Sequence, residues 1–144
     1  MKIEIKKLRE GAVIPTRGSA AAAGYDLRAC IAAPIVIAPG ETAMVGTGLS
    51  IAVPEGYFGA VFARSGLACK QGVRPANCVG VCDSDYRGEY MVALHNDSRV
   101  PCEIAPGDRI AQLVVMPFLE LEFEEKDELS DTARGAGGFG STGR

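Results

Sequence analysis

Gly80-Val81-Cys82-Asp83-Ser84-Asp85-Tyr86-Arg87-Gly88 is a polar stretch that lies between two apolar segments of the chain. It places two carboxylates, a tyrosine and an arginine within five residues. One apolar segment begins near Asn77, and the other runs from Glu89 to His95. This pattern predicts two strands joined by a polar hairpin end. Asp, Ser and Gly are also the ordinary turn residues, so the stretch alone fits a solvated turn equally well.

The segments around this stretch predict an all-β fold, a jelly-roll-like barrel or sandwich of short strands. Runs rich in Val, Ile and Ala are interrupted by Gly or Pro about every 8 to 12 residues, and no long window has a helical stripe. One short helical turn is expected over Gly66–Gln71. The predicted strands are Lys2–Leu8, Tyr25–Ala29, Ile35–Ile37, Glu41–Val53 with a break at Gly46–Gly48, Tyr57–Ala63, Val79–Cys82, Glu89–His95, Arg99–Ile104 and Arg109–Pro117.

Proline and glycine mark three turns, at Pro39-Gly40, Pro54-Glu55-Gly56 and Pro106-Gly107-Asp108. The 144 residues suit a single domain, which we expect to cover residues 1–128. An acidic link at Glu120–Glu128 then leads into a Gly-rich tail, residues 129–144.

Composition excludes several classes of function. A net charge of −3 provides no basic field for a nucleic acid, so no nucleic acid partner is expected. The amino terminus MKIEIKKLRE reads as a strand and not as a signal peptide, and no apolar run reaches the length of a membrane span. Five cysteines, an odd number, favour free thiols in a reducing compartment. We therefore expect a soluble, cytoplasmic protein.

Metal and redox sites built from cysteine or histidine are not expected. Cys78 and Cys82 would lie about 13 Å apart in an extended strand, too far to share an ion or form a disulfide. His95 is the only histidine, and its position at a strand end favours a structural role.

Three polar residues in apolar surroundings are candidates for a site. Asp26 lies in an apolar strand, where it either pairs with Arg28 on the same face or serves a ligand. Ser65 fits an N-cap, and with Arg64 and the following backbone it also fits a phosphate site. Gln112 is the one amide in the segment Ile110–Met116 and requires a partner in the protein or in a ligand.

The carboxy-terminal tail satisfies G-x-G-x-x-G from Gly135 to Gly140 but opens no helix, so it is not a dinucleotide-binding fingerprint. A disordered terminus is one interpretation. The other is a lid, because the tail carries a cation, an aromatic ring and hydroxyls: Arg134, Phe139, Ser141 and Thr142.

Five stretches together resemble the trimeric dUTP pyrophosphatase family, in its order and spacing and over nearly the whole chain. Minor departures concern local packing, such as Ala63 where the family usually has proline. The stretches are AGYDLRA (Ala23–Ala29), RSGLA (Arg64–Ala68), Asn77 with GVCDSDYRGE (Gly80–Glu89), GDRIAQLV (Gly107–Val114) and RGAGGFGSTG (Arg134–Gly143).

The resemblance implies a homotrimer with sites shared between subunits, and hydrolysis of dUTP to dUMP and pyrophosphate with Mg²⁺. Such an activity controls the dUTP pool and supplies dUMP for thymidylate synthesis. By the same resemblance Asp83 orients the attacking water, Tyr86 packs under the deoxyribose, and Asp26 holds metal-bound waters around an ion that the triphosphate mainly ligates. The other implied contacts are Asn77, Gly80 and Val81 for the base, Arg64, Ser65, Gly66 and Gln112 for the phosphates, and Arg134, Phe139, Gly140, Ser141 and Thr142 in the closing tail.

Two alternatives remain open from the sequence. A dCTP deaminase shares the fold and the nucleotide, although no extra carboxylate motif is present to activate water at the base. A nucleotide-sensing interaction protein would keep the fold without catalysis, and the intact Asp83 and tail argue against it.

Overall fold

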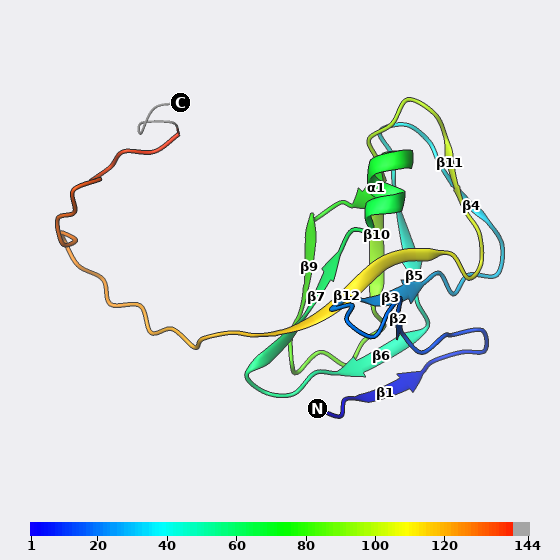
Figure 1. Ribbon diagram of the computed structural model, residues 1–144, viewed down its shortest axis with the longest axis horizontal. Helices are drawn as coiled ribbons and strands as arrows, with labels where there is room; N and C mark the ends of the chain where they lie inside the picture. Colours follow the sequence, from blue (N-terminus) through cyan, green and yellow to red (C-terminus); the bar gives the residue numbers. More distant parts are fainter. Residues whose placement is uncertain (140–144) are drawn as a thin grey trace.

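The computed structural model describes residues 1–139 of the chain. Strands dominate, with one short helix (Figure 1). The prediction of an all-β fold with a single helical turn is confirmed. The elements are β1 (Glu4–Lys7), β2 (Thr16–Arg17), β3 (Tyr25–Arg28), β4 (Ile35–Ile37), β5 (Thr42–Gly46), β6 (Leu49–Ala52), β7 (Tyr57–Phe62), α1 (Ser65–Gln71), β8 (Val73–Pro75), β9 (Val79–Cys82), β10 (Met91–Asn96), β11 (Cys102–Ile104) and β12 (Arg109–Pro117).

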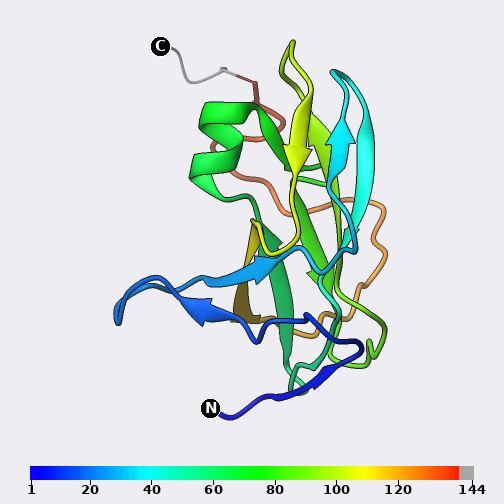
Figure 2. The same cartoon turned by 90° about the vertical axis from the view of Figure 1, so that its right-hand side faces the viewer.

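Two sheets provide most of the architecture (Figures 1 and 2). The larger has five strands in the order β2-β3-β12-β7-β9, and the smaller has three in the order β5-β10-β8. The antiparallel pairs β1-β6 and β4-β11 complete the fold. Within residues 1–139 the sheets stay open, and no closed barrel forms.

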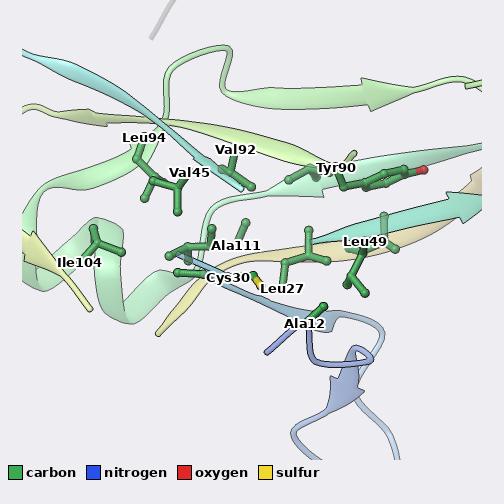
Figure 3. Packing of buried hydrophobic residues seen from close by; sticks show 14 of the residues in the cluster. Ala12, Leu27, Cys30, Val45, Leu49, Tyr90, Val92, Leu94, Ile104 and Ala111 are labelled. Carbon is green, nitrogen blue, oxygen red and sulfur yellow. The ribbon is translucent and has the colours of Figure 1, made fainter. Parts of the chain in front are cut away.

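A continuous apolar core lies between these sheets. Figure 3 shows Val45 and Leu94 of the three-stranded sheet on one side of the core and Leu27 and Ala111 of the five-stranded sheet on the other. All four side chains are fully excluded from solvent. The core therefore fixes how the two sheets face each other, and with them the loops that connect them.

The predicted turns are confirmed by their backbone angles. Gly40, Gly56 and Gly107 have φ values of 78°, 78° and 84°, which a residue with a side chain rarely adopts. Gly40 and Gly107 directly follow a proline, and Gly56 follows one after a single intervening residue. The proline fixes its own φ for the turn, and the glycine adopts the positive φ that completes it.

The predicted hairpin around residues 80–88 is wrong. β9 pairs with β7 in the five-stranded sheet, whereas β10 pairs with β5 and β8 in the smaller sheet. The polar stretch therefore crosses from one sheet to the other. It leaves from the open edge of the larger sheet, because β9 is the last strand of that sheet.

The segment after β12 leaves the body of the protein (Figure 1). The amide of Phe118 donates to the carbonyl oxygen of Gly56 at 3.1 Å, and residues 119–139 form no strand or helix. Leu119, Leu121 and Phe123 alternate with glutamates and are 83%, 68% and 90% exposed. None of the helices in residues 1–139 has the length and apolarity needed to cross a bilayer.

Candidate active site

The crossover between the two sheets borders a cleft of about 390 Å³. Five of the residues predicted from the sequence line it together: Asn77, Gly80, Val81, Asp83 and Tyr86. Asp83 and Tyr86 are exposed, so both reach a ligand in the cleft without a rearrangement of the core. The structure therefore brings the predicted base, sugar and catalytic residues to one place.

The loop that carries Asp83 is held by a short series of hydrogen bonds. The Tyr86 amide donates to the Asp83 carbonyl oxygen at 3.2 Å, which closes a turn. The Tyr86 hydroxyl donates to the main-chain carbonyl oxygen of Glu89 at 2.9 Å. Ser50 Oγ donates to the Arg87 carbonyl oxygen at 2.8 Å, which ties the loop to β6. A side chain at Gly88 would collide with the Tyr86 ring, so glycine is required there.

The Asn77 amide lies beside Gly80 of β9. A Cβ added to Gly80 would be 3.5 Å from Asn77 Nδ2 and 3.2 Å from Val61 Cβ, so the missing side chain leaves room for the amide. The free edge of a strand offers backbone donors and acceptors to a ligand, and the Asn77 amide adds one of each. This combination can read the hydrogen-bonding edge of a planar base.

Burial affects two further groups in the cleft. It raises the pKa of the Cys82 thiol above its ordinary value, with the nearby Asp83 charge adding to the shift. It also raises the pKa of the Tyr90 hydroxyl. Both groups therefore stay protonated at neutral pH, and Cys82 is not a thiolate nucleophile.

A second hollow of about 240 Å³ contains the other predicted residues of the folded body: Asp26, Arg64, Ser65, Gly66 and Gln112. Its centre is a charged cluster. Arg64 Nε donates to Asp26 Oδ1 at 2.7 Å, and Arg109 Nη1 approaches Asp26 Oδ2 at 3.4 Å. The side chain of Asp26 is 14% exposed, so its charge is shielded from water and compensated by two cations.

This arrangement rules out the ion pair between Asp26 and Arg28 that the sequence suggested as one alternative. Its partner is not Arg28, whose Nη1 donates to the Gly107 carbonyl oxygen at 2.9 Å. Arg109 was not among the residues predicted for the site. It is the only cation in the strand Arg109–Pro117, and that isolation in an apolar segment was the available signal.

The sequence left open whether the Gln112 amide bonds the protein or a ligand. The structure provides a partner in the protein. Its Nε2 donates to the Ala63 carbonyl oxygen at 2.9 Å. Gly24 lies so close to the Gln112 side chain that any Cβ there would collide with Oε1. The amide is therefore held in one orientation beside Asp26, its neighbour across β12 and β3.

Ser65 does not cap the helix. α1 begins at Ser65, the N-cap residue is Arg64, and no side chain bonds the first turn. The expected N-cap is therefore wrong, and the Ser65 hydroxyl lines the charged hollow instead.

The tail residues lie apart from both hollows in the described part of the chain. Arg134 Nε donates to the Gly137 carbonyl oxygen at 2.7 Å, and Phe139 is fully exposed. Gly140, Ser141 and Thr142 lie outside the described residues.

The described residues contain no group of three or more His, Cys, Asp or Glu side chains placed to hold a metal ion. All five cysteines are free thiols. His95 bonds Thr42 Oγ1 through Nδ1 at 2.9 Å and lies 3.3 Å from Asp97, which is consistent with the structural role expected for it.

Comparison with known proteins identifies the family. The family model for dUTPase matches residues 10–143. The deoxyuridine 5'-triphosphate nucleotidohydrolase of Nautilia profundicola is 48% identical over 144 residues, covering 100% of both chains. The chain belongs to the dUTPase family. The resemblance seen in the five sequence stretches is thereby confirmed.

Solved dUTPase structures show the same fold. The dUTPase of Staphylococcus bacteriophage 80alpha with dUPNHPP is 28% identical, has a TM-score of 0.85 and aligns over 99% of each chain. A mutant dUTPase from phage phi11 of S. aureus, whose structure concerns the coordination of a structural Mg(II) ion, is 25% identical with a TM-score of 0.81. That match covers 91% of this chain and 100% of the phage chain.

Proposed function

We propose that this protein hydrolyses dUTP to dUMP and pyrophosphate. The observation that carries the proposal is the Asp83 carboxylate in a cleft that Tyr86, Asn77 and the edge of β9 also line, within a chain of the dUTPase family. The activity would limit dUTP and supply dUMP for thymidylate synthesis. The free cysteines support a cytoplasmic location, where thiols stay reduced.

Asp83 serves as the general base in this proposal. Its carboxylate accepts a hydrogen bond from a water molecule and takes a proton as the water oxygen bonds the α-phosphorus. The bond between the α-phosphorus and the bridging oxygen breaks, and pyrophosphate leaves. Asp83 is exposed at the rim of the cleft, which suits a group that must meet solvent water.

The cleft also provides selectivity for the base and sugar. Uracil presents a carbonyl acceptor and an N–H donor, and cytosine reverses this order. The β9 edge with Asn77 offers fixed partners, so a base with the wrong order leaves them unpaired, which is a strong form of discrimination. Tyr86, packed under the deoxyribose, would leave no space for a 2′-hydroxyl.

The charged hollow suits the triphosphate. Arg64 and Arg109 supply two cations beside Ser65, Gly66 and Gln112, and guanidinium groups bind phosphate oxygens in bidentate fashion. Such cations stabilise the charge that develops on the phosphate oxygens during hydrolysis.

The strand register supports a site shared between subunits of a homotrimer. Gly80 of the cleft pairs with Val61, whereas Gln112 of the charged hollow pairs with Phe62. Neighbouring residues of a strand point to opposite faces, so these two groups belong to opposite faces of one sheet. The cleft and the charged hollow share no lining residue. A single ligand would therefore contact the cleft residues of one subunit and the charged hollow of another.

Mg²⁺ is the cofactor in this proposal, and the donor set fits an ion held mainly by the triphosphate. Mg²⁺ keeps several waters and needs only one or two carboxylates beside substrate phosphates. Asp26 is the carboxylate available in the charged hollow, and its two arginine partners leave it suited to bonding metal-bound waters. When bound, the ion neutralises phosphate charge.

Residues 129–144 form the proposed lid on a folded domain of residues 1–128. Arg134 would neutralise phosphate charge, Phe139 would stack on the base, and Gly140, Ser141 and Thr142 would bond the phosphates. Their exposure supports this role, since Arg134 and Phe139 make no contact with the core.

Release of pyrophosphate from dUTP tests the proposal. The purified protein should hydrolyse dUTP in the presence of Mg²⁺ and leave dCTP, dTTP and UTP nearly untouched. Ammonia release from dCTP would instead identify a deaminase. Binding of dUTP without pyrophosphate release would identify a nucleotide sensor.

A further inference from the structure

Glu89 is bonded at both of its polar ends. Its carboxylate accepts hydrogen bonds from Arg9 Nη1 at 2.8 Å, from Arg9 Nη2 and from the Gly48 amide at 2.7 Å. Its main-chain carbonyl oxygen accepts the bond from the Tyr86 hydroxyl. Glu89 therefore connects Arg9, which is remote in sequence, to the ring at the edge of the cleft.

Arg9 itself is bound on two sides. Its Nε and Nη2 donate to the Cys30 carbonyl oxygen at 3.3 and 3.1 Å, while its two terminal nitrogens bond Glu89. The pair occupies a space that exists because residue 46 is glycine. A Cβ at Gly46 would collide with both Arg9 Nη2 and Glu89 Oε1.

The pair is expected to contribute little to stability. Arg9 is 43% exposed and Glu89 20%, and exposed ion pairs typically contribute only about 0.2–1 kcal/mol. The bidentate geometry nevertheless holds the Glu89 side chain in one position. The adjoining backbone is also held by the Tyr90 amide, which donates to the Leu49 carbonyl oxygen at 2.8 Å. The Tyr86 hydroxyl donates to the Glu89 carbonyl oxygen, so the ring and the ion pair are joined through one residue.

We propose that Arg9 and Glu89 are positioning residues that set the discrimination between deoxyribose and ribose. The inference rests on the proposed function, in which the Tyr86 ring packs against the sugar. A ring held by Glu89 leaves no space for a 2′-hydroxyl. Without the pair the ring shifts, and ribonucleotides enter the cleft.

A displacement of about 1 Å in a group that positions the substrate can change the rate by about 10²-fold. A side chain acting through two intermediate bonds should have a smaller effect. We therefore expect the ratio of kcat/KM for dUTP to kcat/KM for UTP to fall about tenfold when the pair is broken. Most of the change should come from a better KM for UTP, because the catalytic Asp83 is untouched.

The test is a double-mutant cycle on the full-length protein with Arg9→Gln, Glu89→Gln and the double variant. Each single variant should lower the sugar selectivity about tenfold, and the double variant should lower it no further, since both act through one contact. Lys7→Ala is the matched control. It removes a neighbouring exposed cation of β1 and should keep the selectivity of the unaltered protein.

Tyr86→Phe provides an independent variant in case a change at Arg9 impairs folding. It removes only the hydroxyl that bonds Glu89, on a side chain that is 42% exposed, and should relax selectivity as far as Glu89→Gln does. Selectivity within twofold of the unaltered protein in Glu89→Gln and Tyr86→Phe would overturn the inference. An equal loss in Lys7→Ala would do so too.

The outcomes also separate the inference from the proposed function. Absence of pyrophosphate release from dUTP by the unaltered protein refutes the function. Release of pyrophosphate with unchanged selectivity in the variants refutes only the positioning role.

Discussion

Asp26 Oδ1, in β3, accepts a hydrogen bond from Arg64 Nε at 2.7 Å. Arg109 approaches the second carboxylate oxygen, so one acidic group orients two cations. A carboxylate shielded from water in this way is costly unless it is paired. The pairing explains why an aspartate is tolerated in β3, and it fixes the cations where a triphosphate would bind.

Asp26→Asn is expected to raise KM for dUTP about tenfold and to raise the Mg²⁺ concentration needed for half-maximal activity. The amide keeps the shape but no longer orients Arg64 or bonds metal-bound waters as strongly. Steady-state kinetics over a Mg²⁺ series measure both effects. Asp127→Asn removes the same charge from the exposed link and should change neither. An unchanged Mg²⁺ requirement in Asp26→Asn would remove Asp26 from the proposed metal site.

Long or strongly patterned elements could be predicted from the sequence. β12 was predicted with its observed bounds, because nine mostly apolar residues follow a Pro-Gly turn. β2 and β8 were missed, because each is short and carries an arginine, whereas the equally short β4 is apolar throughout. The helix was predicted within one residue of its start, but its capping was not, because Arg64 and not Ser65 precedes it.

Which strands and side chains contact each other was harder to predict than which segments form strands. The strands on either side of residues 80–88 were predicted correctly in type, yet they join different sheets instead of forming a hairpin. Strands that follow each other in the sequence often pair, but here β9 pairs with β7 and β10 pairs with β5 and β8. For the same reason nearby Arg28 was one of the two alternatives for Asp26, whereas its cations come from β12 and from the N-cap of α1. The motifs predicted site residues, but only the structure shows that those of the folded body line two separate hollows.

Asp83→Asn is expected to lower kcat for dUTP by about 10²–10⁴-fold, the usual contribution of a general base. The residue is exposed, so the free energy of unfolding should change by less than about 0.5 kcal/mol. Asp85→Asn is the matched control, because Asp85 lies on the same loop but lines a different hollow. Near-normal turnover in Asp83→Asn, measured by pyrophosphate release, would contradict the assignment.

Tyr90→Phe is expected to stabilise the protein. Tyr90 is 2% exposed, and among the described residues its hydroxyl has only the Cys82 thiol, a weak partner, beside it and makes no hydrogen bond of normal geometry. An unsatisfied buried hydroxyl costs about 1–3 kcal/mol, so its removal should raise the free energy of unfolding in urea by up to that amount. Tyr25→Phe removes an exposed hydroxyl and should have little effect. A lower stability of Tyr90→Phe would show that the hydroxyl is bonded in solution.

The stability contributed by Glu89 is expected to depend on pH. Its bonds to the Arg9 guanidinium, helped by the Gly48 amide, hold the pKa of Glu89 below its ordinary value in the folded protein. A carboxyl with a lowered folded pKa adds stability above its unfolded pKa of about 4.3, and loses it as pH falls through the folded value. The stability difference between the unaltered protein and Glu89→Gln should therefore be constant near neutrality and shrink in acid. Glu41→Gln, a change at an exposed residue outside this pair, is the matched control. A difference that stays constant down to pH 3 would contradict the linkage.

Deletion of residues 134–144 is expected to leave folding intact and to abolish most turnover. The described tail residues contribute nothing to the core, so stability should not change. Hydrolysis should fall because an open site leaves the triphosphate in water without Arg134 beside it.

Mixed assemblies show whether the tail acts on another subunit. Residues 118–133 can span roughly 50 Å when extended, and they leave the body of the protein in that form (Figure 1). The tail-deleted chain supplies an intact Asp83, and the Asp83→Asn chain supplies an intact tail. Co-expressed with different affinity tags and purified through both, they should recover activity that neither parent has, because one chain's tail would close over the other chain's cleft. If the mixed protein is no more active than the sum of its parents, the tail closes on its own chain or is not a lid.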